Sequence, residues 1–239
     1  GEFDSVFEID PECTTEELRR QALTACALDA LVARRGLGAV AYFYEGNPGS
    51  AGQDVVTSII AGNSILTTNG VPVAGECDVR TVLAMKMLSV AGAGGAFSEF
   101  YYMDFERGHV LLGHDGPSHL GMATGRVRLV PLPVFHGKPG SGLSIQMSVH
   151  SGPVTLLALV DAPDGTLEML VAEGEAVEGP VFEVGNTNSR YQFSLDPAEF
   201  VRRWSEAGPG HHCAIGHGHR ASLLEKVADL LGIRIVRIC

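Results

Sequence analysis

Clusters of basic residues are missing from this 239-residue sequence. Only 17 Lys and Arg residues stand against 28 Asp and Glu residues, so the formal net charge is -11 at pH 7. Nucleic acids, polyphosphates and anionic membranes bind proteins through gathered positive charge, and the sequence contains no Lys/Arg run that could supply it. We therefore expect no nucleic acid and no membrane among the partners of this protein.

Long apolar runs and paired cysteine motifs are missing as well. The longest apolar runs, such as VTLLALV at 154–160, have the length of a strand, whereas a bilayer span needs roughly 20 residues. The five cysteines form no CxxC motif and leave one unpaired, so a reducing, cytoplasmic setting is the simplest expectation. We interpret Cys77 and Cys213 as small buried residues, with an activated cysteine nucleophile as the alternative.

The first part of the sequence alternates helical and strand patterns. Thr14 and Glu17 have the spacing of a capping box, and the amphipathic stretch that follows them ends at Gly36. A short apolar run at 37–46 predicts a buried strand, and helical patterns follow at 54–62 and 76–92. This alternation is typical of an α/β layer.

From Phe97 onward the pattern changes to short strands separated by Gly, Pro and Asp turns. Strands are predicted at 97–105, 126–135, 143–151, 154–161, 166–173 and 190–195, and a final helix and strand at 221–232 and 233–238. The link APDG at 162–165 indicates a hairpin. We predict an α/β fold followed by mainly antiparallel β structure: a partial α/β domain over 1–94 and a β-barrel-like domain over 95–239.

Glu99 lies in an alternating stretch of large apolar residues. Strict alternation places Phe97, Tyr101, Met103 and Phe105 on the same strand face as this carboxylate. A carboxylate on an apolar face requires a cation, a hydrogen-bonding partner or a bound metal.

Other residues of the same chemistry stand at turns. Glu76 follows the strand-like VPV at a helix start, where α/β folds carry functional groups and where the helix dipole alone also favours an acid. His114 and His119 flank the segment DGPS. Because an extended pair points to opposite faces, we expect only one of the adjacent His211 and His212 to enter a site. Carboxylates and imidazoles without a thiolate suit Mn²⁺ or a similar octahedral ion.

Four segments resemble, in the same order, the second half of the L-arabinose isomerase family and its L-fucose isomerase relatives. They are AGECDVRTVLAMKML, FSEFYYMDFERGHVLLGH, SGPVTLLALVD and GPGHHCAIGHGHRASLLEKVADLLGI. Members of the family are three-domain, oligomeric enzymes that interconvert aldoses and ketoses with a divalent metal, typically Mn²⁺. The resemblance extends from the first long helix to Ile233 and implies a metal-dependent sugar isomerase that acts on a monosaccharide as a homo-oligomer.

The resemblance also implies roles for individual residues. Glu76 and Glu99 correspond to the two catalytic carboxylates, which bind the metal as well. His212 corresponds to a metal ligand, and His114 supplies the remaining ligand, with His119 as the alternative.

Substrate contacts follow from the same resemblance. Arg190 stands where the family has a basic residue near the site, and His119 and His211 are further candidates for contact with the sugar. Moving hydrogen between C1 and C2 requires a base, an acid and a cation that stabilises the substrate oxygens, and two glutamates beside a metal supply all three.

Two other functions and one structural expectation remain open. The chain could be a non-catalytic carbohydrate-binding or regulatory module of the same fold, or a metal-dependent hydrolase or lyase with the same ligands. The first residues, GEFDSVFEID, contain neither an initiating Met nor an apolar signal core. We therefore expect a piece of a longer chain, an incomplete enzyme that self-associates or rearranges to cover the surface left exposed and has little or no activity alone.

Overall fold

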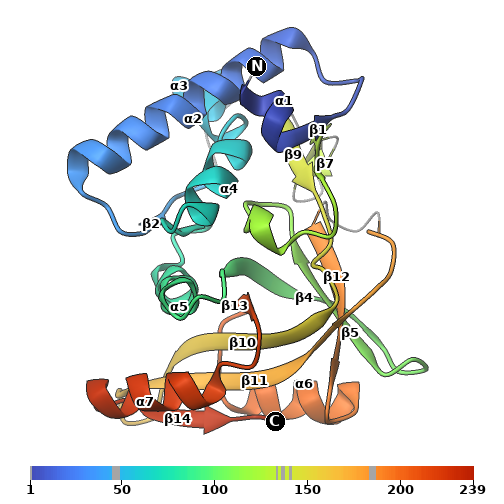
Figure 1. The fold of residues 1–239 in the computed structure, drawn as a ribbon. Coiled ribbons are helices and arrows are strands. Elements are labelled where there is room, and N and C mark those ends of the chain that lie inside the picture. The colour runs from blue at the N-terminus through green and yellow to red at the C-terminus, as the bar shows by residue number, and fades with distance from the viewer. Residues whose placement is uncertain (1, 45–48, 133, 136–137, 140–141, 183–186) are drawn as a thin grey trace.

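The computed structural model describes residues 2–44, 49–132, 134–135, 138–139, 142–182 and 187–239. Within these ranges, α1 and α2 lie at one end of the molecule and β14 at the other, and the helical layer precedes the barrel along the chain (Figure 1). None of the described helices combines the length and the apolar character that crossing a membrane requires.

Helices and a short parallel strand pair make up the first part of the fold. The elements are α1 Glu2–Val6, β1 Phe7–Ile9, α2 Thr15–Arg35, β2 Val40–Ala41, α3 Ala51–Val56, α4 Ile60–Thr68, β3 Val73–Ala74 and α5 Val79–Val90. Strands β2 and β3 pair in parallel, which confirms the predicted α/β character. The helical stretch predicted at 54–62 is divided between α3 and α4, because α3 ends at Thr57.

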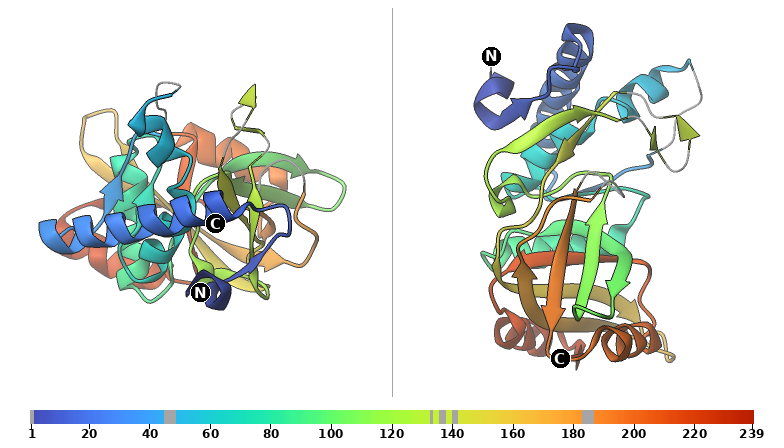
Figure 2. Two further views of the ribbon diagram at one scale, coloured as in Figure 1. Left: turned by 90° about the horizontal axis from the view of Figure 1, so that it is seen from above. Right: turned by 90° about the vertical axis from the view of Figure 1, so that its right-hand side faces the viewer.

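The long helix α2 begins and ends where the sequence predicts. Thr14 and Glu17 form both hydrogen bonds of the capping box, and Gly36 ends the helix in the left-handed conformation. Seen from above, α2 runs across the top of the molecule (Figure 2).

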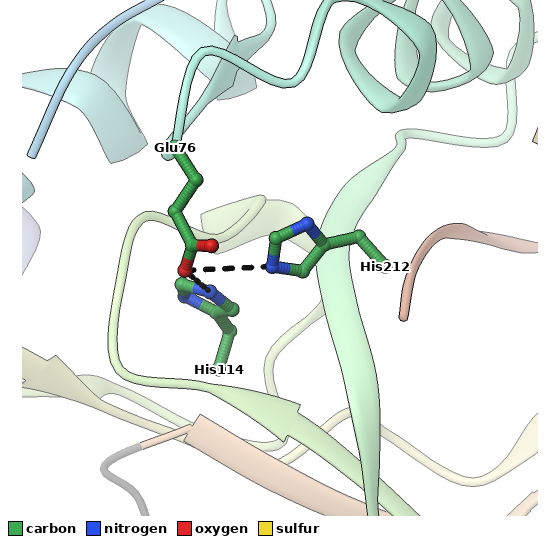
Figure 3. A group of neighbouring side chains, drawn as sticks. All are labelled: Glu76, His114 and His212. Carbon is green, nitrogen blue, oxygen red and sulfur yellow. Dashed lines mark ion pairs between the residues drawn. The ribbon is translucent and has the colours of Figure 1, made fainter. Parts of the chain in front are cut away.

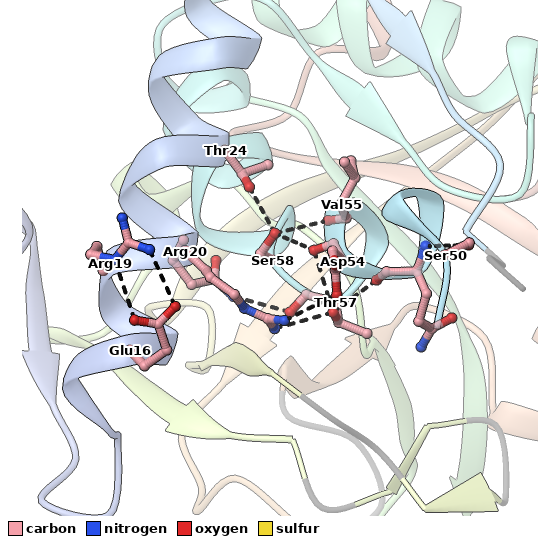
Figure 4. A network of polar contacts seen from close by, with 11 residues as sticks. Glu16, Arg19, Arg20, Thr24, Ser50, Asp54, Val55, Thr57 and Ser58 are labelled. Atoms are coloured by element: carbon pink, nitrogen blue, oxygen red, sulfur yellow. Dashed lines mark hydrogen bonds and ion pairs between the residues drawn. The ribbon is translucent and has the colours of Figure 1, made fainter. Parts of the chain in front are cut away.

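Polar contacts join α2 to the segment that links α3 and α4 (Figure 4). The hydroxyls of Thr24 and Ser58 are 2.7 Å apart, and the Arg20 guanidinium reaches the Thr57 hydroxyl at 3.3 Å and the Asp54 carboxylate at 3.5 Å. These contacts fix α3 and α4 against α2, which holds the upper layer over the barrel.

A closed antiparallel barrel forms the second part. Its strands are, in order around the barrel, β10 Gly152–Asp161, β13 His212–His217, β4 Ala96–Asp104, β5 His109–His114, β12 Thr187–Phe193 and β11 Leu167–Val177. Strand β11 pairs again with β10 and closes the barrel, and β14 Arg234–Arg237 adds to β11 in parallel. The predicted barrel and the hairpin at 162–165 are both confirmed.

Helices cover the barrel from two directions. The apolar faces of α5 and α7 Ala221–Leu231 pack on its outer surface, while α6 Pro197–Glu206 places Phe200 and Trp204 in the main core. Each fully buried side chain of this kind contributes about 1.5–3 kcal/mol. Helix α6 was not predicted, although Asp196 followed by Pro197 is a helix-start signal.

A smaller sheet crosses the predicted domain boundary. Strand β1 pairs in parallel with β6 Val127–Pro131, which pairs with β9 Leu143–Gln146. The short strands β7 Val134–Phe135 and β8 Lys138–Pro139 and the turn η1 Leu120–Met122 complete the described elements. Residues 7–9 thus belong to a sheet of the second half, and the division at 94/95 stays a prediction.

A β-bulge in β4 changes which residues share the face of Glu99. Phe100 pairs with Leu112, but Tyr102 pairs with Leu111, so Tyr101 is an extra residue without a partner on β5. Beyond the bulge every side chain is on the other face from the one that strict alternation gives. The prediction that Met103 and Phe105 share the face of Glu99 is therefore wrong.

Candidate metal centre

Glu76 lies in a strained turn between β3 and α5. The carbonyl of Gly75 accepts the N–H of Asp78 at 3.0 Å, and both central residues, Glu76 and Cys77, have positive φ angles, 57° and 55°. They are the non-glycine residues with positive φ in the described part of the chain. Such a conformation costs about 1–3 kcal/mol per residue and persists where the surroundings enforce it, often at functional sites. The Tyr42 carbonyl, which accepts the Cys77 N–H at 2.9 Å, is one such support.

Two buried imidazoles point at one oxygen of Glu76 (Figure 3). Glu76 Oε1 is 3.8 Å from His114 Nε2 and 3.6 Å from His212 Nε2. Both nitrogens are buried and have no hydrogen-bond partner among the described residues. Ligand atoms of all three side chains lie within 4.8 Å of one another, although they come from a turn, the end of β5 and the start of β13.

His212 is oriented by a residue that the sequence analysis does not identify. Asp78 Oδ2 is 3.0 Å from His212 Nδ1. Asp78 also caps α5, because its Oδ1 accepts the N–H of Thr81 and its Oδ2 accepts the Thr81 hydroxyl. An Nδ1–H donated to this carboxylate leaves the Nε2 lone pair facing Glu76, as in carboxylate–histidine–metal triads. A helix-start acid is visible in the sequence, but its partner 134 residues away is not.

His114 is held differently. The Gly116 N–H donates to His114 Nδ1 at 2.8 Å, so the proton of the neutral ring is on Nε2 and faces Glu76. The ring of Phe97 packs against both imidazoles, with centroids 4.5 Å from His114 and 4.2 Å from His212. For His114 to bind an ion through Nε2, the ring proton has to leave that nitrogen and the Gly116 hydrogen bond has to be released.

Both carboxylates of this group are strongly acidic. The neighbouring His114 lowers the pKa of Glu76 to about 2 against the effect of burial, and His212 and His211 add to the lowering. Burial raises the pKa of Asp78, but hydrogen bonds from His212 and Thr81 outweigh it and bring the pKa to about 2. Both groups are therefore carboxylates at neutral pH.

A second set of possible ligands overlaps the first on its exposed side. Ligand atoms of Glu99, His211 and His212 also lie within 4.8 Å of one another. Glu99 is half-buried and pairs in register with His212 across β4 and β13. His211, with 65% of its side chain exposed, places Nε2 3.6 Å from the second oxygen of Glu76.

Both adjacent histidines thus reach Glu76. The expectation that only one of them enters the site is wrong, because His211 lies in the bend before β13 and strand alternation does not apply to it. The structure brings together Glu76, His114 and His212, with Glu99 and His211 beside them.

Two predicted site residues lie outside this group. His119 begins the turn η1 and is partly buried, and its Cδ2 is near Gly94. Arg190 lies on β12, where Nη1 donates to the Pro180 carbonyl at 2.8 Å. The alternative in which His119 replaces His114 as the ligand therefore has no support in this geometry.

The two cysteines considered in the sequence differ in burial. Cys213 is fully buried, and burial raises the pKa of its thiol above the ordinary range. Cys77 is exposed in the strained turn. The interpretation of Cys213 as a buried residue is confirmed, whereas that of Cys77 is wrong.

The space beside Glu76 and His114 is small. A cavity of about 10 Å³ lies there, lined also by Tyr42 and Gly75, and such a volume holds about one water-sized sphere. An ion fits this space and a sugar does not. Comparison of the sequence with models of protein families finds no match, and comparison with curated proteins finds none either.

Proposed function

We propose that this chain carries the metal centre of an aldose–ketose isomerase of the arabinose and fucose isomerase kind. One observation carries the proposal: the buried Nε2 atoms of His114 and His212 face a single carboxylate oxygen of Glu76 without hydrogen-bond partners among the described residues. Buried polar atoms without partners cost about 1–3 kcal/mol each. Coordination of a cation would remove that cost at His212, whose Nε2 lone pair faces Glu76, and at His114 once its ring proton and the Gly116 hydrogen bond are released.

The donor set fits a divalent ion such as Mn²⁺. Glu76, His114 and His212 offer one oxygen and two nitrogens within 4.8 Å, and Glu99 can add a second carboxylate. Imidazole and carboxylate without thiolate suit such an ion. When bound, the ion would stabilise negative charge on the substrate oxygens at C1 and C2.

The two glutamates have different surroundings, which divides their roles. Glu76 Oε1 faces two buried imidazoles, so it serves mainly as a ligand. Glu99 is half-buried near the exposed His211. From this position it can take a proton from one sugar carbon and return it to the other, because a carboxylate close to the substrate acts first as base and then as acid.

Proton exchange provides the test of this proposal. Protein loaded with Mn²⁺ is incubated in deuterium oxide with aldopentoses and 6-deoxyhexoses. NMR records both ketose formation and deuterium, at C1 of the ketose and at C2 of the recovered aldose. We expect both with at least one sugar, and neither in Glu99→Gln, even at Mn²⁺ concentrations that saturate the variant. Hydrolysis or elimination products would instead indicate a hydrolase or lyase, and sugar binding without exchange would indicate a carbohydrate-binding module. Either result would reject the isomerase.

The reducing compartment and the homo-oligomeric state expected from the sequence belong to the same proposal. All five cysteines are free thiols, which accords with a reducing compartment such as the cytoplasm. A homo-oligomer would complete the site from neighbouring subunits.

A further inference from the structure

A second cavity lies on the outer face of the barrel, towards the turn end of the β4–β5 hairpin. It has a volume of about 320 Å³, at the lower end of the range for ligand pockets. Aromatic side chains form much of its wall and polar groups the rest; the lining includes Tyr101, Tyr102, Phe182, Asp104, His109 and Arg190.

The β-bulge places this cavity on the same face as Glu99. Glu99 pairs with Gly113 and Tyr102 pairs with Leu111, and because paired residues share a face, all four are on one side of the barrel wall. If Tyr101 were paired regularly instead of bulged, Tyr102 would share the face of Phe100 and point to the barrel interior. The step from Gly113 to Leu111 is about 7 Å along the strand, so the cavity begins about one sugar length from Glu99.

Tyr101 lies between Glu99 and the rest of the cavity wall along β4. It lines the cavity and stands two residues after Glu99 on the same strand. Bulges commonly re-aim a side chain beside an active site. The wall of the cavity is thus continuous with the surroundings of Glu99.

The chemistry of the wall matches a polyhydroxylated chain. Tyr102 and Phe182 present large exposed rings to the C–H groups of a sugar. Arg190 is held over the Phe182 ring at 4.1 Å and by the Pro180 carbonyl, so its guanidinium is fixed in place. His109 Nδ1 is buried without a hydrogen-bond partner among the described residues. Sugar hydroxyls both donate and accept, so they can pair with either kind of group.

We propose that this cavity binds the distal carbons and hydroxyls of the open-chain sugar whose C1 and C2 lie at Glu99. The inference rests on the proposed isomerase, because the cavity of about 10 Å³ at Glu76 cannot hold the substrate. Contacts of this kind bind ground state and transition state alike, so their loss raises KM and leaves kcat nearly unchanged.

Two variants and two matched controls test the cavity. Arg190→Met removes the guanidinium and keeps the length of the side chain, and Tyr102→Leu removes an aromatic ring that is 61% exposed. The controls are Arg107→Met and Phe105→Leu, which change residues of the same hairpin that do not line the cavity. Urea unfolding confirms that each variant is folded.

Saturation-transfer NMR on metal-free protein, with L-arabinose and L-fucose as probes, measures binding separately from turnover. We expect transfer to the protons of C4 and C5 in the parent and in both controls, and its loss in both cavity variants. In the loaded enzyme, we expect KM to rise by about tenfold or more in the cavity variants, with kcat within about threefold.

Two results distinguish a failure of the cavity assignment from a failure of the proposed isomerase activity. Unchanged transfer and unchanged KM in Arg190→Met and Tyr102→Leu would overturn the cavity assignment and leave the isomerase in place. Loss of transfer in both variants, in a parent that turns over no sugar with any metal, would support the cavity and reject the isomerase.

Discussion

Replacing Asp78 by Asn should weaken metal binding while leaving the fold nearly unchanged. Asp78 Oδ2 accepts from both His212 Nδ1 and the Thr81 hydroxyl, and Oδ1 accepts the Thr81 N–H. In Asp78→Asn the amide oxygen can keep the cap, but the NH₂ group now faces His212 Nδ1 and cannot accept its proton. The ring proton then moves to Nε2, which is the atom that faces Glu76.

The size of the effect follows from these contacts. Loss of an outer partner of a metal-bound histidine lowers metal affinity by about 10–100-fold, which corresponds to about 1.4–2.7 kcal/mol. Stability should fall much less, because Asn caps helices about as well as Asp. The loss of a negative charge at the start of α5 costs about 0.3–1 kcal/mol.

Asp196 offers a matched control. It caps α6 by accepting the N–H groups of Ala198 and Glu199 and has no imidazole partner among the described residues. Titration calorimetry with Mn²⁺ and urea unfolding of the metal-free protein are measured for Asp78→Asn and Asp196→Asn. We expect similar losses of stability and a loss of Mn²⁺ affinity in Asp78→Asn alone. If Asp78→Asn binds Mn²⁺ within about twofold of the parent, the role of Asp78 in orienting His212 is refuted.

Three further outcomes are expected. Burial lowers the pKa of His119 and His217, with His150 adding to the effect at His217. As the pH falls, the unfolded chain therefore binds protons at these histidines before the folded protein does. The urea concentration at the midpoint of unfolding should fall as the pH drops from about 7 to about 5. A midpoint that rises over this range contradicts the assignment. Cys77→Gly, at a φ of 55°, should raise the free energy of unfolding by up to about 1 kcal/mol, and a clear decrease in a thermal melt would argue against backbone strain there. Leu143→Ala, in the core, should cost about 2–5 kcal/mol, whereas Leu230→Ala, at a residue 86% exposed, should stay within about 0.5 kcal/mol; equal losses in urea unfolding would show the core to be wrongly placed.

Local patterns predicted the parts of the fold that depend on neighbouring residues. The capping box at Thr14 and the left-handed Gly36 each involve contacts within a few residues, so the bounds of α2 were correct. The hairpin at 162–165 is equally local. The strand period over 97–105 was correct only up to Tyr101, because the bulge depends on how β4 pairs with β5 and no Gly or Pro marks it.

The candidate site was predicted in part for the same reason. The residue types at Glu76, Glu99, His114 and His212 were visible along the chain, and the family resemblance supplied their grouping. The role of Asp78 could not be predicted, because its partner is brought to it only by the closed barrel. The sequence also gave no indication that the outer face beyond Glu99 is hollowed.

The position of β13 in the barrel sets the order in which this protein can assemble. β13 pairs with β10 on one side and with β4 on the other, and its contact with β4 joins residues more than a hundred positions apart. Closing so long a loop is entropically costly, so this pairing comes late in folding. His212 is the first residue of β13, and a chain still being synthesised therefore cannot form the metal centre until residue 212 has emerged. Until β13 has paired, Glu76, Glu99 and His114 lack His212, which belongs to both groups of possible ligands, so neither group is complete.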